Sequence, residues 1–264
     1  MPYQLPPYPQ LIAHRGNSSP SPENTRLAIE QAISLGVDMV EVDVRLSRDG
    51  VPVLIHNKTL RQTTNGSGRV AKHTLAELKL LDAGSWKGPQ FAGEPLLTLH
   101  ESLELARHRV GLNLDLKTHS AIWSTLEAVR QMNMTDEVIV TGCCLSCVKT
   151  VRRSEARLTV LLNLNQAMDF LARRRPKSLF QSIYLSQART ANVAGININH
   201  HYVDQELVDS AKRSGLSIWT WTVDDENRFR KLLAIGVDSI TTNWPERMIP
   251  VIQQHRNRHI GEPS

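Results

Sequence analysis

Short apolar runs alternate along the chain with segments whose apolar residues recur at helical spacing. The runs predict buried strands of a parallel sheet, and the periodic segments predict helices that cross over between them. The predicted strands are Leu11–Ala13, Met39–Val44, Val51–Ile55, Leu112–Leu116, Val138–Val140, Leu158–Leu162, Ala194–Ile198, Leu216–Trp221 and Asp238–Ile240. The predicted helices are Thr25–Leu35, Leu75–Leu81, Leu99–Ala106, Ala121–Gln131, Cys147–Arg153, Asp204–Ser214 and Glu226–Ile235.

This alternation favours an α/β fold, a TIM-type (β/α)8 barrel. Eight strands close such a barrel, so one of the nine predicted strands is expected to be wrong or to lie outside it. The turn signal Arg48-Asp49-Gly50 leaves no room for a helix before Val51–Ile55. We therefore expect the regular repeat to be broken at this point by a tight hairpin turn.

Residues 57–96 form the one long stretch without a clear strand, and they are rich in Gly, Thr and Lys. Long loops inside compact domains are usually functional. We interpret this segment as a small cap insertion over the barrel mouth, with a solvated excursion as the alternative. The chain length of 264 residues fits a single large domain over 1–264 that contains this insertion.

Charged residues occupy alternate positions within two predicted strands. In Val40-Glu41-Val42-Asp43-Val44 the two carboxylates share one face. The pattern recurs in Leu112-Asn113-Leu114-Asp115-Leu116-Lys117, where Asn113, Asp115 and Lys117 share one face. The apolar residues can cover the helix side, so the carboxylates must point into the barrel, where a cation has to neutralise them. Glu41, Asp43 and Asp115 are therefore predicted ligands of one hard divalent cation, Mg²⁺ or Ca²⁺. The alternative places them on the outside of half-exposed antiparallel strands.

Two histidines come at strand ends: His14 closes the first predicted strand and His56 follows the third. Active sites of α/β barrels lie at the carboxyl ends of the strands, so both should face the carboxylates. A pair of imidazoles can supply one general base and one general acid. Arg15 and Lys117 add cations suited to phosphate oxygens. These parts are what the cleavage of a phosphodiester requires.

Two weaker signals point to other chemistries. The spacing Cys144-x-x-Cys147 could belong to a zinc site, but no second such pair exists, so we interpret these residues as unpaired thiols where a strand meets a helix. The run Arg173–Lys177 could touch nucleic acid, but it is short and isolated. We interpret it as a solvated loop and expect no nucleic-acid partner.

Aromatic and histidine residues near the later strands are further candidates for the pocket. Trp219 and Trp221 share a strand face, and either pocket lining or core packing fits them. We take Trp221 as a predicted substrate contact. His200-His201 follows a predicted strand and either borders the site or lies outside it.

Composition and charge narrow the function classes. The net charge of +5 and pI of about 9.3 suit an anionic substrate. No apolar run approaches the length of a membrane span, and the opening MPYQLPPYPQ lacks the features of a secretory signal. The cysteine count of three is odd and too low for a disulfide scaffold. We therefore expect a cytoplasmic protein without a membrane span.

The order of several short motifs resembles that of the glycerophosphodiester phosphodiesterase family, in its bacterial cytosolic form. The matching segments are His14-Arg15-Gly16, Pro22-Glu23-Asn24-Thr25, Glu41-Val42-Asp43-Val44, Asp49-Gly50 with Val51–His56, Thr63-Thr64-Asn65-Gly66, Trp221-Thr222-Val223 and Thr242-Asn243-Trp244-Pro245. Each motif is short, but their combined order over nearly the whole chain is highly specific.

The resemblance implies a TIM-type, PLC-like phosphodiesterase barrel and metal-dependent hydrolysis of glycerophosphodiesters to glycerol 3-phosphate and an alcohol. It implies that His14 and His56 are the acid–base pair. It also implies that Arg15 and Lys117 contact the phosphate, and that Glu41 and Asp43 bind the metal ion.

Three positions depart from the family pattern. Asp115 stands where the family usually has a glutamate as third ligand, so its reach is one methylene shorter. Asn57 replaces an acidic residue after the second histidine, and Asp224 stands where asparagine is usual.

Two other functions stay open at this point: a phosphodiesterase of lysophospholipids or phosphoinositide-type lipids on the same barrel, and a protein that binds a phosphate ligand without turnover. The expected partner is a small-molecule glycerophosphodiester. Assembly into a homo-oligomer also stays open.

Overall fold

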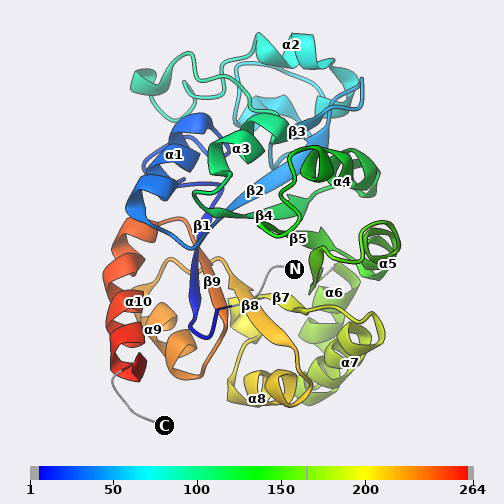
Figure 1. Ribbon diagram of the computed structural model, residues 1–264, viewed down its shortest axis with the longest axis vertical. Helices are drawn as coiled ribbons and strands as arrows, with labels where there is room; N and C mark the ends of the chain where they lie inside the picture. The colour runs from blue at the N-terminus through cyan, green and yellow to red at the C-terminus, as the bar shows by residue number, and fades with distance from the viewer. Residues whose placement is uncertain (1–5, 165, 261–264) are drawn as a thin grey trace.

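The computed structural model describes residues 6–164 and 166–260, and within them the strands close into a parallel barrel (Figure 1). The barrel strands pair in the order β1-β2-β4-β5-β6-β7-β8-β9, and β9 returns to β1. Their bounds are β1 Gln10–His14, β2 Met39–Leu46, β4 Gly111–Leu116, β5 Val138–Cys143, β6 Thr159–Asn163, β7 Gly195–Asn199, β8 Ser217–Trp221 and β9 Ser239–Thr242. The predicted TIM-type (β/α)8 barrel is confirmed.

One of the nine predicted strands, Val51–Ile55, lies outside this barrel. It is β3 (Pro52–Leu54), which runs antiparallel to the end of β2 and pairs Leu54 with Val44. The Asp49-Gly50 turn joins the two strands without a helix, and Gly50 adopts the positive φ of 80° that this turn needs. The expected break in the βα repeat is therefore present between the second and third strands.

Helices surround the barrel and cover its outer face, except for α2, which lies within residues 57–96 (Figure 1). Their bounds are α1 Arg26–Leu35, α2 Leu75–Lys79, α3 Leu99–Ala106, α4 Ile122–Gln131, α5 Leu145–Ser154, α6 Gln166–Arg174, α7 Lys177–Thr190, α8 Gln205–Arg213, α9 Glu226–Ala234 and α10 Pro245–Ile260. Short 3₁₀ turns lie at Leu60–Gln62, Val70–Lys72, Pro89–Phe91, His119–Ala121 and His200–Tyr202. None of the helices over the described residues combines the length and apolar composition needed to cross a membrane.

The predicted solvated loop at Arg173–Lys177 is confirmed only for Arg175 and Pro176. This run is exposed, as expected, but Arg173 and Arg174 end α6 and Lys177 begins α7. The side chains of Arg173 and Lys177 form ion pairs with Asp169 and Asp204. Pro176 caps the start of α7, where its missing N–H is not needed. Because of these exposed charges, no helix was predicted between β6 and β7, where α6 and α7 make the crossover.

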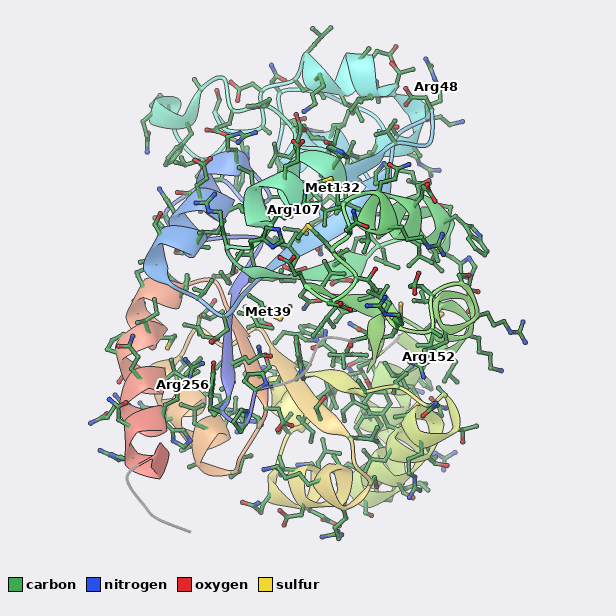
Figure 2. All side chains as sticks on the ribbon, viewed as in Figure 1. Met39, Arg48, Arg107, Met132, Arg152 and Arg256 are labelled. Carbon is green, nitrogen blue, oxygen red and sulfur yellow. The ribbon has the colours of Figure 1, made fainter. Side chains whose placement is uncertain are left out.

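The strands bury apolar side chains on both faces, and the two faces build separate cores. Val40, Val42 and Val44 point outward into the large core between strands and helices. A smaller cluster fills the barrel interior and consists of Ile12, Met39, Ile139, Leu161 and Trp219. Figure 2 shows Met39 in the middle of the molecule and Arg48 and Arg152 at its margin. The interior cluster closes the barrel from below and leaves its upper end for polar residues.

Residues 57–96 pack beside β3 at one end of the molecule, around α2 (Figure 1). They share a small core with β3 and the residue after it, made by Val53, Ile55, Leu60, Val70, Leu78, Ala83 and Leu96. One contact reaches toward the mouth, because Lys87 Nζ donates a hydrogen bond of 2.9 Å to the carbonyl of Ser18. The described residues of this segment do not line the pocket at the barrel mouth, so its role as a cap stays a prediction.

Candidate active site

A pocket of about 530 Å³ opens at the carboxyl ends of the barrel strands. This is the end at which parallel α/β barrels carry their active sites. The predicted site residues that line it are His14, Arg15, Glu41, His56, Asp115, Lys117 and Trp221. Asp43, the remaining one, is fully buried and contacts Lys117 and Arg15 from below. The structure therefore brings all eight predicted residues to one place.

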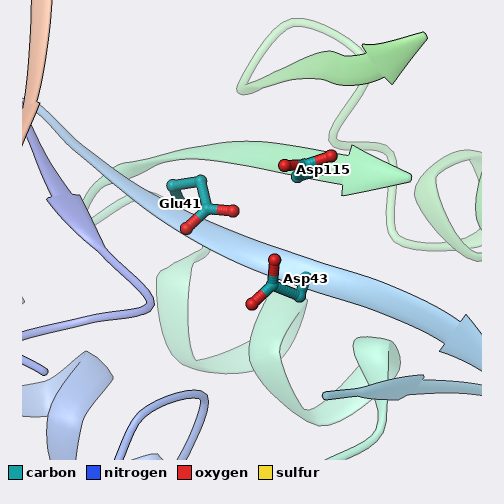
Figure 3. Close-up of side chains that lie close together, drawn as sticks. All are labelled: Glu41, Asp43 and Asp115. Atoms are coloured by element: carbon teal, nitrogen blue, oxygen red, sulfur yellow. The ribbon is translucent and has the colours of Figure 1, made fainter. Parts of the chain in front are cut away.

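Three carboxyl groups meet inside the barrel (Figure 3). Glu41 and Asp43 lie two residues apart on β2, and the register of β2 with β4 sets Asp115 directly beside Asp43. One oxygen from each of the three lies within 4.8 Å of the others. The inward orientation predicted from the alternation is confirmed, which excludes the alternative of outward carboxylates on an exposed sheet. Their role as metal ligands stays a prediction.

The pKa values of Glu41 and Asp43 are shifted in opposite directions. Burial, together with the charges of Asp43 and Asp115, raises the pKa of Glu41 well above its usual value. Burial also acts to raise the pKa of Asp43, but the cations of Lys117 and Arg15 overcome it and hold that pKa below its usual range. One carboxylate is thus kept ionised by neighbouring cations, while the ionised form of its neighbour is costly.

Lys117 and Arg15 are the cations that hold the cluster together. Lys117 Nζ lies 2.7 Å from Asp43 Oδ1 and 2.6 Å from Asp115 Oδ2. Arg15 Nε lies 3.0 Å from Asp43 Oδ2, and its Nη1 donates to Glu23 at 2.9 Å. Both side chains are less than a fifth exposed, so they also face the pocket as fixed positive charges.

The turn before α1, Pro22–Thr25, was identified in the sequence only as a motif, and the structure shows that its side chains contact the site. The amide of Asn24 donates to Asp43 Oδ2 at 2.7 Å and accepts from the Asp43 N–H at 3.1 Å. Glu23 binds Arg15, and Thr25 caps α1 by accepting from the Ala28 N–H. The Pro22–Thr25 motif therefore both starts a helix and fixes two charged groups of the site.

His14 lies at the end of β1, inside the pocket. Its Nε2 is 3.8 Å from Glu41 Oε2, and its Nδ1 is 2.6 Å from Asn243 Oδ1. Burial and the charge of Arg15 lower the pKa of His14 to about 4. The imidazole is therefore neutral at physiological pH and can accept a proton.

His56 follows β3 and faces the same pocket. Arg45, a buried residue on β2 that sequence reasoning missed, donates hydrogen bonds of 2.9 and 2.6 Å to the His56 carbonyl and so fixes its backbone. The His56 Nδ1 lies 3.1 Å from Asn57 Oδ1. Burial lowers the pKa of His56 below its usual value, although Asp43 opposes this effect.

Amide and hydroxyl side chains complete the wall opposite the histidines, and sequence reasoning assigned them no role. Thr141 Oγ1 donates to Asn113 Oδ1 at 2.7 Å, and the Gly142 N–H donates to Asn163 Oδ1 at 2.7 Å. Asn113, Thr141 and Asn163 all line the pocket. A signal was present, because each is a polar residue in or at the end of a predicted strand, where a barrel turns polar side chains inward.

The weaker candidates separate clearly in the structure. Trp221 lines the pocket, whereas Trp219 belongs to the interior apolar cluster. His200 lies after β7, outside the residues that line the pocket, and its carbonyl accepts a hydrogen bond from Arg228. The cysteines at the β5–α5 junction carry free thiols, as predicted, and Cys144 borders the pocket.

Comparisons with known proteins agree with this site. The profile of the glycerophosphoryl diester phosphodiesterase family matches residues 14–247. A Bacillus subtilis protein, YhdW, is 35% identical over 243 residues, which are 90% of this chain and 96% of that protein. A protein of Caldanaerobacter subterraneus subsp. tengcongensis, named a glycerophosphodiester phosphodiesterase, is 32% identical over 253 residues, 92% of this chain and 98% of its own.

A solved structure has the same architecture. It is a phosphodiesterase of Oleispira antarctica in complex with the product sn-glycerol-3-phosphate, with a TM-score of 0.81 and 30% identity. The match covers 95% of this chain and 97% of the other. With its barrel, its pocket and a family match over most of its length, the chain belongs to the glycerophosphoryl diester phosphodiesterase family.

Proposed function

We propose that this pocket hydrolyses glycerophosphodiesters to glycerol 3-phosphate and an alcohol, with His14 and His56 carrying the protons. The observation that carries the proposal is the pair of imidazoles that face the same pocket as three clustered carboxylates. The product bound to the Oleispira antarctica relative supports the choice of substrate. The pocket volume of about 530 Å³ suits a small molecule of this class.

Phosphodiester cleavage needs two proton transfers. The attacking oxygen must lose a proton, and the departing alcohol oxygen must gain one. His14 is neutral at physiological pH because its pKa is about 4, so it suits the first acceptance of a proton. His56 faces the same pocket and is the second carrier. Arg15 and Lys117 balance the negative phosphate oxygens as charge builds up on them.

The residues of the carboxylate cluster fit a hard divalent cation. Their oxygens lie within 4.8 Å of one another, and burial makes the ionised form of Glu41 costly although Lys117 and Arg15 partly offset this cost. We propose Glu41, Asp43 and Asp115 as ligands of Mg²⁺ or Ca²⁺. The bound ion would act as a Lewis acid toward the phosphate. Lys117 keeps Asp43 ionised, and therefore ready to bind a cation, throughout the physiological pH range.

Trp221 is the proposed contact for the alcohol or glycerol part of the substrate. It lines the pocket at the end of β8, and its indole nitrogen is buried. The apolar ring offers a flat surface, and the N–H offers a hydrogen-bond donor for a hydroxyl group. We also propose the reducing cytoplasm as the place of action, which the free thiols of the three cysteines support.

The experiment is the release of glycerol 3-phosphate from glycerophosphocholine. It is run with chelator, and again after Mg²⁺ or Ca²⁺ is restored. His14→Ala and His56→Ala are each expected to lower kcat by at least about 10²-fold. His100→Ala, an exposed histidine on α3, is the matched control. Near-normal turnover of both site variants would refute the assigned roles, and faster hydrolysis of a long-chain lysolipid would move the substrate to that class.

A further inference from the structure

A chain of hydrogen bonds lies behind His14, on the side away from the carboxylates. Asn243 Oδ1 is 2.6 Å from His14 Nδ1, and Asn243 Nδ2 donates to Asp224 Oδ2 at 2.7 Å. Asp224 follows β8, Asn243 follows β9, and His14 ends β1. Because these three strands are neighbours in the closed barrel, their ends meet at one point of its rim.

Asp224 fixes which way the amide of Asn243 points. An ionised carboxylate only accepts hydrogen bonds, so the NH₂ group must be the part that faces it. The other oxygen of Asp224 accepts from the Asn243 backbone N–H at 2.8 Å and from Thr242 Oγ1 at 2.9 Å. Ser18 Oγ also donates to Asn243 Oδ1, at 3.1 Å. Two of these contacts, to Asp224 Oδ2 and from Ser18 Oγ, orient the amide so that its carbonyl oxygen faces the imidazole, and the other two hold Asp224 in place.

The amide orientation in turn decides where the imidazole carries its hydrogen. A carbonyl oxygen is only an acceptor, so the close contact at Nδ1 requires a hydrogen on Nδ1. A neutral imidazole has one N–H, which leaves a lone pair on Nε2. That nitrogen faces Glu41 Oε2 at 3.8 Å and hence the pocket. In the opposite tautomer, Nε2 would carry a hydrogen and could not accept a proton.

We propose that Asp224 and Asn243 are positioning residues, which hold His14 in the tautomer whose Nε2 accepts a proton during the reaction. The inference rests on the proposed role of His14 as a proton carrier. It adds a residue, Asp224, that touches neither the substrate pocket nor the imidazole. His56 has a simpler support: its Nδ1 meets Asn57, its sequence neighbour.

The first test changes one atom of the hydrogen-bonded chain Asp224–Asn243–His14, called the relay below. Asp224→Asn replaces a pure acceptor with an amide, whose NH₂ can now face Asn243. Asn243 can then turn its oxygen to the new amide and its NH₂ to His14, which favours the wrong tautomer. We expect kcat for glycerophosphocholine to fall about 10- to 100-fold, the loss typical of outer partners that orient a functional imidazole, with KM changed by less than about threefold. Asp225→Asn is the matched control: Asp225 caps α9, and asparagine caps equally well.

The second test restores the acceptor by exchange. In the double variant Asp224→Asn/Asn243→Asp, a carboxylate contacts the imidazole directly and the amide lies behind it. That carboxylate is again a pure acceptor at Nδ1, so the productive tautomer returns. We expect the double variant to recover most of the kcat lost in Asp224→Asn, which is a non-additive result. A loss that only adds in the double variant would overturn the proposal.

The third readout does not depend on activity. In protein labelled with ¹⁵N-histidine, the His14 signals are identified by their loss in His14→Gln. We expect Nδ1 to be the protonated nitrogen in the wild-type protein and in the exchange variant, and Nε2 to be protonated in Asp224→Asn. An Nε2–H tautomer in the wild type would overturn the relay. Loss of activity in His14→Ala together with a fully active Asp224→Asn would reject the relay and leave the proposed function standing. Full activity of His14→Ala would instead reject the proposed role of His14.

Discussion

The ammonium group of Lys117 lies 2.7 Å from Oδ1 of Asp43, a side chain with no exposed surface. The same nitrogen is 2.6 Å from Asp115 Oδ2. A buried carboxylate is costly unless a cation stays beside it. Lys117 is therefore a structural counter-ion as well as a proposed phosphate contact, and the two roles can be separated.

Lys117→Met should destabilise the protein and reduce its activity. The variant leaves Asp43 with Arg15 as its remaining cation in the cluster, and breaking a buried pair typically costs about 3 kcal/mol. We expect a loss of this order in the free energy of unfolding, measured with urea, and a fall of about 10²-fold in kcat/KM. Lys231→Met, at an exposed position of α9, should change stability by less than about 0.5 kcal/mol. Equal stability of the two variants would contradict the counter-ion role.

Glu41→Gln should stabilise the metal-free protein and weaken its response to cations. It removes one of three carboxylates that lie within 4.8 Å, and it keeps an oxygen that can accept from the Arg15 N–H. We expect an unfolding free energy about 1 kcal/mol higher, or roughly 2–4 °C in Tm, without added metal. Wild-type protein should gain Tm with saturating Mg²⁺ or Ca²⁺, and the variant should not. A variant that gains as much as the wild type would remove Glu41 from the ligand set.

Gly142→Ala should displace Asp115. Gly142 has a φ of +72°, and an added Cβ would lie 2.2 Å from Asp115 Oδ1 and 2.5 Å from the Leu116 carbonyl. Gly215→Ala is the matched control, because Gly215 has a φ of +67° and open space around it. We expect both variants to lose about 1 kcal/mol from backbone strain, and Gly142→Ala to lose further stability through the clash, together with turnover and cation binding. Unchanged kinetics in Gly142→Ala would show that the position of Asp115 does not matter.

The stability of residues 57–96 should depend on pH through Asp82. Hydrogen bonds from Ser85 and from the N–H groups of Gly93 and Gly84 lower the pKa of Asp82 below its usual value. The folded-state pKa is thus below the unfolded one, so the stabilisation is present above about pH 4 and is lost as the pH falls. We expect Asp82→Ala to lower Tm at pH 7 and to differ less from the wild type at pH 3. A difference that stays constant between these pH values would contradict this linkage.

The sequence predicted the barrel because its signal is local and repeated. Strands such as Leu112–Leu116 read as alternating runs, and the side-chain period of two fixes which residues share a face. That rule alone placed Glu41 and Asp43 on the inner face of β2. Helical periodicity was not recognised at residues 166–190, for which no helix was predicted and where two helices separated by Pro176 connect β6 to β7. The run of exposed arginines indicated a loop, although α7 has buried apolar positions, Phe180 and Tyr184 among them, that indicate a helix.

The site was predicted in its parts but not in its connections. Chemistry-bearing residues at strand ends could be chosen from the pattern, since a parallel barrel gathers those ends. The supports around them could not. Arg45 reads as one more charge on a strand, yet its guanidinium binds the His56 carbonyl. Asn24 reads as part of a helix start, yet its amide holds Asp43.

The sequence by itself determined the order of the strands and of most helices between them, the inward face of β2 and β4, and the residues able to carry phosphodiester chemistry. The tertiary structure decided which of them touch. His14 and Asn243 are 229 residues apart and meet only because β9 closes against β1. Periodicity is a property of neighbouring residues, whereas barrel closure depends on the packing of all strands at once. The tautomer of His14 is therefore set by contacts that no local pattern encodes.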